Sequence, residues 1–282
     1  MLANASSRRW IGLGLLALAA CLTGCERSGP LSEAIEYRPM TFGTGEIAEI
    51  HVTAISGSVS ICGETGRSSV DVTAVLRVRG RSPQQARQRV EGLAVSMQRQ
   101  GTRVDLSFAP PVEADSWDES PSVRFEMIVP VKTMIVIETT HGEVTLVDIA
   151  GDIDLQVTNG GIHVVHAGGR LKARAERSDI RIEASELAVD LETEIGDIGF
   201  SGCFIGHENR LVAIHGGISI EVPPDSELQI EAQAVTGRIE SNLPWVGDVS
   251  GPEWLATLNA ATTHAFLRST NGWIRIDAWE NI

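Results

Sequence analysis

Cysteine is scarce in this sequence, with four residues in 282, and two of them, Cys21 and Cys25, fall in the N-terminal leader. No Cys-x-x-Cys pair and no Cys/His spacing typical of zinc sites occurs. The remaining two, Cys62 and Cys203, lie far apart in the repeat described below. An oxidising compartment would permit a disulfide, but a bridge needs Cα atoms within about 7 Å. We therefore expect two small, buried, free thiols.

Positive charge is also in short supply, because 23 Lys and Arg face 37 Asp and Glu, a net charge of −14. The mature chain is two units more negative, because the leader carries Arg8 and Arg9 and no acid. Phosphate backbones repel such a chain, so nucleic acid partners are excluded. Long-range attraction to anionic lipid or polysaccharide is disfavoured as well. The acids form no long run, which indicates a solvated surface.

Catalytic signatures are missing too. The sequence holds no nucleophile elbow, no His-x-x-x-His spacing, and no Gly-x-Gly fragment that opens a helix after a strand. We interpret the seven histidines as surface or turn residues, and His141 and His215 as turn residues that tolerate a positive φ. Asn159 and Asn271 occupy the same place before a glycine. We expect no catalytic residues, no cofactor and no metal site; a polysaccharide-cleaving enzyme would need acids converging in a groove.

The N-terminus has the features of a processed leader. After Arg8 and Arg9 comes an apolar stretch of 13 residues, 10–22, which is too short to span a bilayer comfortably. Leu22-Thr23-Gly24-Cys25 looks like a bacterial lipobox, which implies cleavage before Cys25, a diacylglycerol on its sulfur and an acyl chain on its new amine. Cys21 also fits this pattern, but it would leave Leu22 and Thr23 in place of a polar tether. Glu26, in the place where Asp would retain a lipoprotein at the inner membrane, indicates transport to the outer membrane.

A nine-residue repeat begins at Gly142 and runs for seven steps. An apolar residue stands two positions after each turn, and another stands four positions after it. The first set is Val144, Ile153, Ile162, Leu171, Ile180, Val189 and Ile198; the second is Leu146, Leu155, Val164, Ala173, Ile182, Leu191 and Phe200.

The strongest glycine positions recur every 18 residues, so we predict two short strands per coil. Stacked coils would bury the apolar columns that a single strand leaves exposed. The predicted fold is an all-β, right-handed parallel β-solenoid or β-roll, with neighbouring coils about 4.8 Å apart.

The predicted organisation has four parts. Residues 1–24 are a lipoprotein signal peptide, 25–45 a flexible tether, 46–140 N-terminal strands with one short helix, and 141–282 the regular repeats with a Trp-rich C-terminal cap. The helix is expected to begin at Ser82, with Pro83 in its first turn and Gln85 at the capping-box place. The segment 112–120 is acidic, contains Trp117, and is expected to form an exposed loop.

The stacking predicts columns on the surface. On one sheet, Asp154, Lys172 and Asp190 should align, as should Gln156, Arg174 and Glu192, so that opposite charges alternate. On the other sheet, Asp179 should lie beside Asp197; the pair could hold calcium, but tolerated repulsion in water is the simpler interpretation.

Tryptophans crowd the last forty residues, where we expect Trp245, Trp254, Trp273 and Trp279 to cover the apolar end of the stack. The alternative is an aromatic platform for sugars or a partner protein, to which Trp117 could also belong.

Four short motifs in this order resemble the bacterial putative adhesin family of unknown function, whose members are β-strand-repeat proteins and often lipoproteins. They are 56–61 (SGSVSI), 125–130 (FEMIVP), 158–162 (TNGGI) and 269–274 (STNGWI), within a likeness that covers residues 46–277. The resemblance implies a β-solenoid in the cell envelope and supplies no catalytic residues. We therefore expect a non-enzymatic, membrane-anchored envelope lipoprotein that binds, adheres or scaffolds, with an envelope protein or a glycan as partner. The alternative is a carbohydrate-binding or polysaccharide-acting protein that uses the Trp-rich end or loop 112–120.

Overall fold

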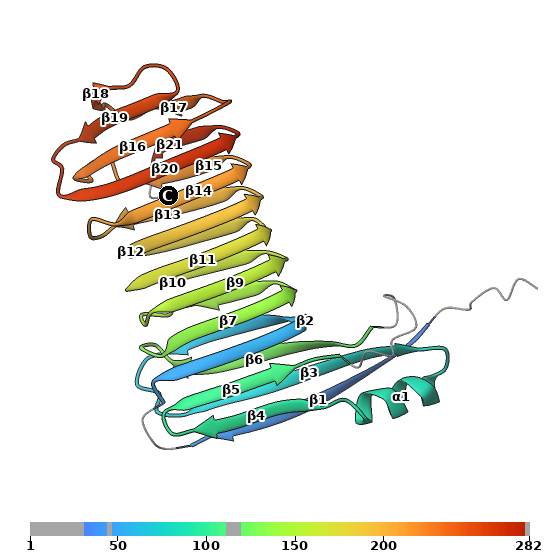
Figure 1. Ribbon diagram of the computed structural model, residues 1–282. Coiled ribbons are helices and arrows are strands. Elements are labelled where there is room, and N and C mark those ends of the chain that lie inside the picture. Colours follow the sequence, from blue (N-terminus) through green and yellow to red (C-terminus); the bar gives the residue numbers. More distant parts are fainter. Residues whose placement is uncertain (1–30, 44–46, 111–119, 280–282) are drawn as a thin grey trace, which may run out of the picture.

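The computed structural model describes residues 31–43, 47–110 and 120–279, which form 21 strands and one helix (Figure 1). Hydrogen bonds join all 21 strands into a single, mainly parallel sheet that folds back on itself. We call its two ladders face A and face B. The long strands β2 (Glu49–Glu64) and β12 (Ile180–Ile195) pass from one face to the other and link the two.

Face A also contains β1 (Ser32–Phe42), β3 (Val70–Gly80), β6 (Ser122–Pro130), β8 (Val144–Val147), β10 (Ile162–Ala167), β13 (Ile198–Phe204), β15 (Ile218–Val222), β17 (Ile239–Ser241) and β21 (Ile274–Ala278). Face B also contains β4 (Val95–Gln100), β5 (Arg103–Phe108), β7 (Met134–His141), β9 (Ile153–Asn159), β11 (Arg170–Arg177), β14 (Asn209–His215), β16 (Leu228–Ala234), β18 (Val246–Asp248), β19 (Glu253–Leu258) and β20 (Thr263–Asn271).

The predicted all-β class and the 18-residue spacing are confirmed. Ile162 lies opposite Ile180 on face A, and Leu171 lies opposite both Ile153 and Val189 on face B. All fourteen repeat positions are buried, each with at most 2% of its surface exposed. The β-branched and leucine side chains suit a strand whose every second residue points inward. They form one continuous apolar core between the faces.

A column of glycines allows the turns to stack. Gly142, Gly160, Gly196 and Gly216 all have φ between +149° and +156°. A Cβ on Gly160 would lie 1.9 Å from the carbonyl oxygen of Gly142, and one on Gly216 would lie 2.0 Å from that of Gly196. Only glycine permits both this backbone conformation and this close contact between layers.

The residues before these glycines do not take the predicted positive φ. Instead, Asn159 Nδ2 lies 3.5 Å from His141 Nε2, and Asn271 Nδ2 lies 3.0 Å from His215 Nδ1. Since the glycine supplies the positive φ, the preceding side chain is left to contact its neighbour in the column.

At both ends, strands distant in sequence are inserted into the stack. On face B, β20 lies between β14 and β16, and β2 lies between β5 and β7; on face A, β21 lies between β15 and β17. The antiparallel strands β19 and β18 form the outer edge beyond β16, at the end of the stack that holds the last strands of the chain (Figure 1). Spatial order therefore departs from chain order at both ends.

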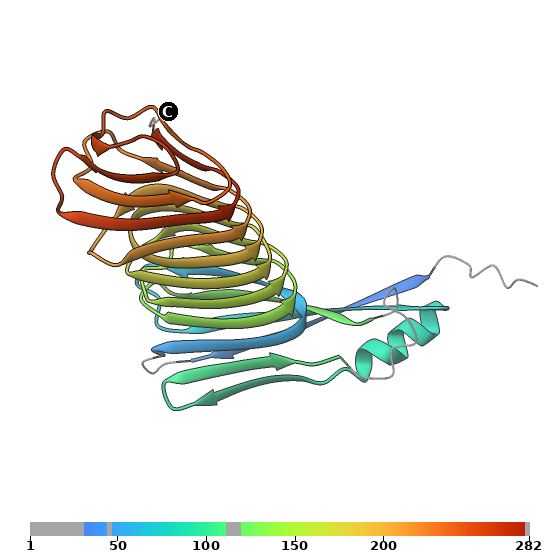
Figure 2. The same cartoon turned by 45° about the horizontal axis from the view of Figure 1, so that its top comes forward.

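The opposite end is a layer built from β1, β3, β6 and the helix α1 (Pro83–Glu91) (Figure 2). The helix begins as predicted: Ser82 Oγ accepts a hydrogen bond from the Gln85 backbone N–H at 3.2 Å. The predicted tether at 25–45 is wrong for residues 32–42, which form β1 along the whole of β3. The alternation of β1 escaped the sequence analysis because Ile35 and Tyr37 point outward, whereas Glu36 and Arg38 are on the more buried side.

Candidate functional site

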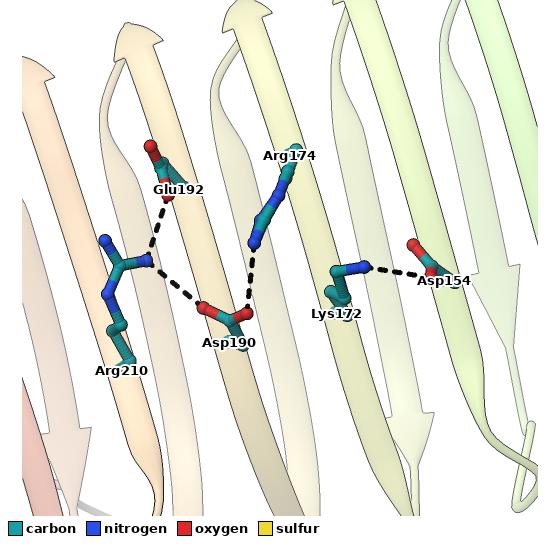
Figure 3. A network of polar contacts seen from close by, with 6 residues as sticks. All are labelled: Asp154, Lys172, Arg174, Asp190, Glu192 and Arg210. Atoms are coloured by element: carbon teal, nitrogen blue, oxygen red, sulfur yellow. Dashed lines mark hydrogen bonds and ion pairs between the residues drawn. The ribbon is translucent and has the colours of Figure 1, made fainter.

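The outward side chains of face B form the predicted charged ladder (Figure 3). Lys172 lies in register between Asp154 and Asp190, and its Nζ is 3.3 Å from Asp154 Oδ2. Arg174 also lies in register between Gln156 and Glu192, as predicted.

The ion pairs nevertheless also join the two columns, the one that contains Lys172 and the one that contains Arg174. Arg174 Nη2 reaches Asp190 at 3.4 Å, and Arg210 Nη1 lies 3.2 Å from Asp190 Oδ1 and 3.0 Å from Glu192 Oε2. Asp190 is thus held between two guanidinium groups. Partial burial lowers the pKa of Arg210, but hydrogen bonds to Glu192 and Asp190 outweigh it and raise that pKa above its ordinary value. Arg210 therefore remains a fixed cation.

Beside the ladder the repeat is interrupted. Leu191 pairs with Leu211, which follows it by 20 residues and not by the regular 18. The added residues lie in the loop 205–208, which ends at the buried Asn209. Asn209 Oδ1 accepts from the Val189 N–H at 3.1 Å, and Nδ2 donates to the Ile205 and His264 carbonyls at 3.1 and 2.9 Å. Asn209 thus takes a core position and fixes the loop to two neighbouring strands. The sequence analysis missed it, although an asparagine at an aliphatic repeat position was a visible signal.

The loop and the ladder enclose a hollow of about 900 Å³. Its floor is formed by β11, β12, β14 and β20, and the loop forms a wall. Side chains of both charges and one aromatic ring line it, among them Lys172, Arg174, Asp190, Arg210, Glu231 and Phe266.

The aromatic ring is placed where a ligand would meet it. Phe266 points outward and half-buried from β20, opposite Arg210 on one side and Glu231 on the other. His264, two residues earlier, is exposed on the same side of the strand. A flat apolar ring flanked by charged donors and acceptors can bind a polar ligand that also has an apolar face.

The described tryptophans differ in exposure. Trp254 is only 9% exposed and packs in the core, and Trp245 is half-buried with its Nε1 donating to Ser241 Oγ at 2.9 Å. Trp279 is half-buried, whereas Trp273 is 42% exposed and lies against Gly217, where a Cβ would come within 2.4 Å of the indole. A sugar platform needs exposed rings side by side, so these positions favour a covering role.

Several predicted features lie outside the described residues. They are Cys25, Trp117 and, apart from Ser120, the loop 112–120.

The paired aspartates of face A lie beside each other, as predicted, and each also accepts a hydrogen bond from a turn. Asp179 Oδ1 accepts from the Asp197 N–H at 3.0 Å, and Asp197 Oδ1 accepts from the Gly217 N–H at 2.7 Å. Arg181 Nη2 lies 3.2 Å from Asp179 Oδ2. The carboxylates thus satisfy turn N–H groups of the next layer, a role that the sequence analysis did not anticipate.

The thiols differ from each other. Both are free, but Cys62 is exposed, so its predicted burial is wrong: on β2 it takes an outward position. Cys203 is partly buried, and burial, followed by the charges of Glu186 and Asp225, raises its pKa.

Within the described part of the chain, no three His, Cys, Asp or Glu side chains gather as a metal ligand set, and no helix is long and apolar enough to cross a membrane.

No protein-family model and no curated protein matches this chain. Two solved structures are similar to it, each with 12% sequence identity. One is a putative cell adhesion protein from Clostridium sporogenes, with a TM-score of 0.37 over 88% of this chain and 100% of that one. The other is a putative adhesin from Bacteroides fragilis, with a TM-score of 0.42 over 86% and 97%. These structural neighbours are thus bacterial proteins named as adhesins, in agreement with the resemblance found in the sequence.

Proposed function

We propose that this protein is a non-enzymatic lipoprotein of the cell envelope, anchored to the outer membrane through acylated Cys25. Its strands, two to a coil of about 18 residues, form a right-handed parallel β-solenoid that serves as a binding, adhesion or scaffolding surface. The observation that carries this proposal is the hollow on face B. It is a preformed recess over a rigid floor, and ligand sites are generally concave and preformed.

The fixed charges of the hollow are suited to binding a ligand. Arg210 is held as a cation, and Asp190 is shared between two arginines. These groups are suited to fix the orientation of a ligand by charge and hydrogen bonding.

Photo-crosslinking in living cells tests the binding surface. A photoreactive residue at Glu208, on the wall of the hollow, should give a discrete crosslinked product. The same residue at Ser219, on face A, is the control and should not give that product. Adding Phe266→Ser to the Glu208 chain should remove it. Identical products from both positions, or none from Glu208, would contradict the proposal.

A second test concerns the anchor. Mass analysis of the N-terminal peptide should find Cys25 carrying a diacylglycerol and an acyl chain, and the protein should fractionate with membranes. Cys25→Ala should abolish both, whereas Cys21→Ala should leave both unchanged. Protease treatment of intact cells then separates the two possible orientations, since a protein facing the periplasm would escape digestion and could not act as an adhesin.

A carbohydrate ligand is the second candidate, and Phe266 between Arg210 and Glu231 favours it. Sugar rings place an apolar face on an aromatic ring while their hydroxyls bond to charged side chains. Titration with neutral and with uronic acid oligosaccharides tests this idea. Phe266→Ser should abolish binding of either, and Arg210→Gln should weaken mainly the uronic acids. Failure of both classes to bind the native chain would reject the candidate.

A further inference from the structure

The acidic chain has one strongly basic segment. Residues 77–103 contain seven arginines and a single acid, Glu91. The segment starts at the end of β3 and continues through α1 and β4 to the start of β5, so it lies in the terminal layer opposite the C-terminal edge (Figures 1 and 2). The charge of this molecule is therefore unevenly distributed along the stack.

Four arginines of this segment are exposed around the start of β1. Ser32 pairs with Gly80, so the chain enters the sheet between Arg79 and Arg81. The side chains of Arg77 and Arg79 are each 49% exposed, and the single carboxylate of Glu33 lies 3.4 and 3.8 Å from them. One carboxylate between two guanidinium groups leaves a net positive charge there. The exposed arginines are Arg77, Arg79, Arg81 and Arg87.

Apolar side chains lie beside them on the outer side of the sheet. Ile35, directly opposite Arg77, is 44% exposed, and Tyr37, opposite Val75, is 66% exposed. Tyrosine and arginine together are typical of surfaces that meet the headgroup region of a bilayer. These four residues, Ile35, Tyr37, Arg77 and Arg79, point from the outward side of β1 and β3, and we call them the arginine face. The helix α1 packs on the other side of the two strands.

The layer that carries this face is rigid. Arg38 on β1 donates from Nη1 to the Leu93 carbonyl at 2.6 Å and from Nη2 to the Val90 carbonyl at 3.2 Å, which ties the strand to the end of α1. Arg89 donates to the Arg79 carbonyl at 3.1 Å. The helix is thus fixed to the strands that carry the face.

We propose that the arginine face docks on the surface of an anionic phospholipid bilayer. This inference rests on the proposed lipid anchor at Cys25. Six residues separate Cys25 from Ser32, so the seven Cα–Cα steps between them span at most about 25 Å. The anchor therefore keeps the arginine face near the headgroups.

The negative net charge does not oppose this contact. Exposed charges act over about one Debye length, some 8 to 10 Å at physiological salt. Acids several strands along the stack, at about 4.8 Å a strand, lie beyond that distance from the arginine face. At the face itself, the guanidinium groups of Arg77 and Arg79 outweigh the single carboxylate of Glu33 that contacts them.

Vesicle sedimentation tests the docking without the anchor. The chain from Glu26 to Ile282 contains every described strand and helix and no lipid. It should bind vesicles of phosphatidylcholine with phosphatidylglycerol and not phosphatidylcholine alone. Salt at about 1 M, where the Debye length is about 3 Å, should release it. Absence of binding to the anionic vesicles would overturn the inference.

Substitution assigns the binding to the face. Near an anionic surface each arginine contributes a factor of about five, so Arg77→Gln and Arg79→Gln together should weaken binding about twenty-five-fold. The matched control removes the same charge from two exposed, ion-paired arginines farther along the stack: Arg181→Gln and Arg275→Gln. It should retain most of the binding, and equal losses in the two double variants would overturn the inference. Tyr37→Ser, at a side chain too exposed to matter for folding, should also weaken binding.

The outcome is separable from that of the proposed function. Acylated Cys25 together with no binding to anionic vesicles would leave the anchor intact and reject the docking. Binding by the unlipidated chain together with an unmodified Cys25 would support the docking surface and reject the anchor.

Discussion

The glycine column makes a sharp prediction, because two adjacent glycines of one turn have opposite surroundings. Gly160 has φ +151°, and a Cβ there would lie 1.9 Å from the Gly142 carbonyl oxygen. At Gly161 the nearest atom to a Cβ is Glu143 Cγ at 3.9 Å, an ordinary contact. Gly160→Ala should therefore be severe and Gly161→Ala mild.

The magnitude follows from the geometry. A relaxed contact between carbon and oxygen is about 3.3 Å, so the layers at Gly160 would have to move apart by roughly 1.4 Å. That movement would break the hydrogen bond from the Gly142 N–H to the Asn159 carbonyl, now 2.9 Å. Backbone strain costs about 1–3 kcal/mol and overpacking about the same, so Gly160→Ala should lose about 2–6 kcal/mol. Gly161→Ala should change stability by less than about 1 kcal/mol.

Denaturant unfolding, followed by circular dichroism, measures both variants against the native chain. Stacked repeats interact mainly with their neighbours, so hydrogen exchange should accelerate most in β8, β9 and β10. The reasoning is refuted if both variants lose similar stability, or if Gly160→Ala unfolds with an unchanged midpoint.

Three further predictions concern single side chains. Asn209→Ala should lower the free energy of unfolding by about 2–4 kcal/mol and speed hydrogen exchange in loop 205–208, because it leaves buried backbone groups unpaired. An unchanged exchange rate would contradict the role of Asn209 in fixing the loop. Maleimide should modify Cys62 rapidly at neutral pH and Cys203 only at higher pH, since burial and nearby acids raise the pKa of Cys203; equal rates measured by mass spectrometry would be inconsistent with this difference. Trp254→Ala should cost about 3–5 kcal/mol, whereas Trp273→Ala, at a half-exposed ring, should cost clearly less, and thermal unfolding would reveal a reversed order.

The repeat could be predicted from sequence because its period is written in the chain. Ile162 and Ile180 face each other since an 18-residue step returns to the same place in the next layer. The helix at Pro83 was predictable for another local reason, its cap at Ser82. Both features depend on residues close in sequence or on a fixed period.

The order of the terminal strands could not be predicted in this way. The units that begin at Ile218, Ile239 and Ile274 have similar turns and similar strands, and any two could pair. In the structure Ile274 lies opposite both Ile218 and Ile239, so the last unit is inserted between the earlier two. Nothing local distinguishes this order from simple succession, because the choice depends on which arrangement best covers the final edge.

The hollow arises from a departure from the repeat. A strict 18-residue period would continue the ladder as a flat surface, and flat surfaces of paired charges offer little to a ligand. The two added residues before Asn209 lengthen loop 205–208, which forms one side of the hollow, and the inserted β20 brings Phe266 beside Arg210. Both events are interruptions of the pattern that builds the core. In this molecule the regular residues make the floor rigid, and the irregular ones give the floor a wall and an aromatic ring.

The two proposed surfaces constrain each other. On face B, five strand steps separate β2, next to the terminal layer, from β14 at the hollow, which at about 4.8 Å a step is roughly 24 Å. If the arginine face, which belongs to face A, lies on the bilayer, the hollow on face B lies that far along the stack and on the opposite side of it, turned away from the headgroups. Its ligand must then be a soluble or polymeric component of the envelope, and its affinity should not depend on the lipid composition that governs docking.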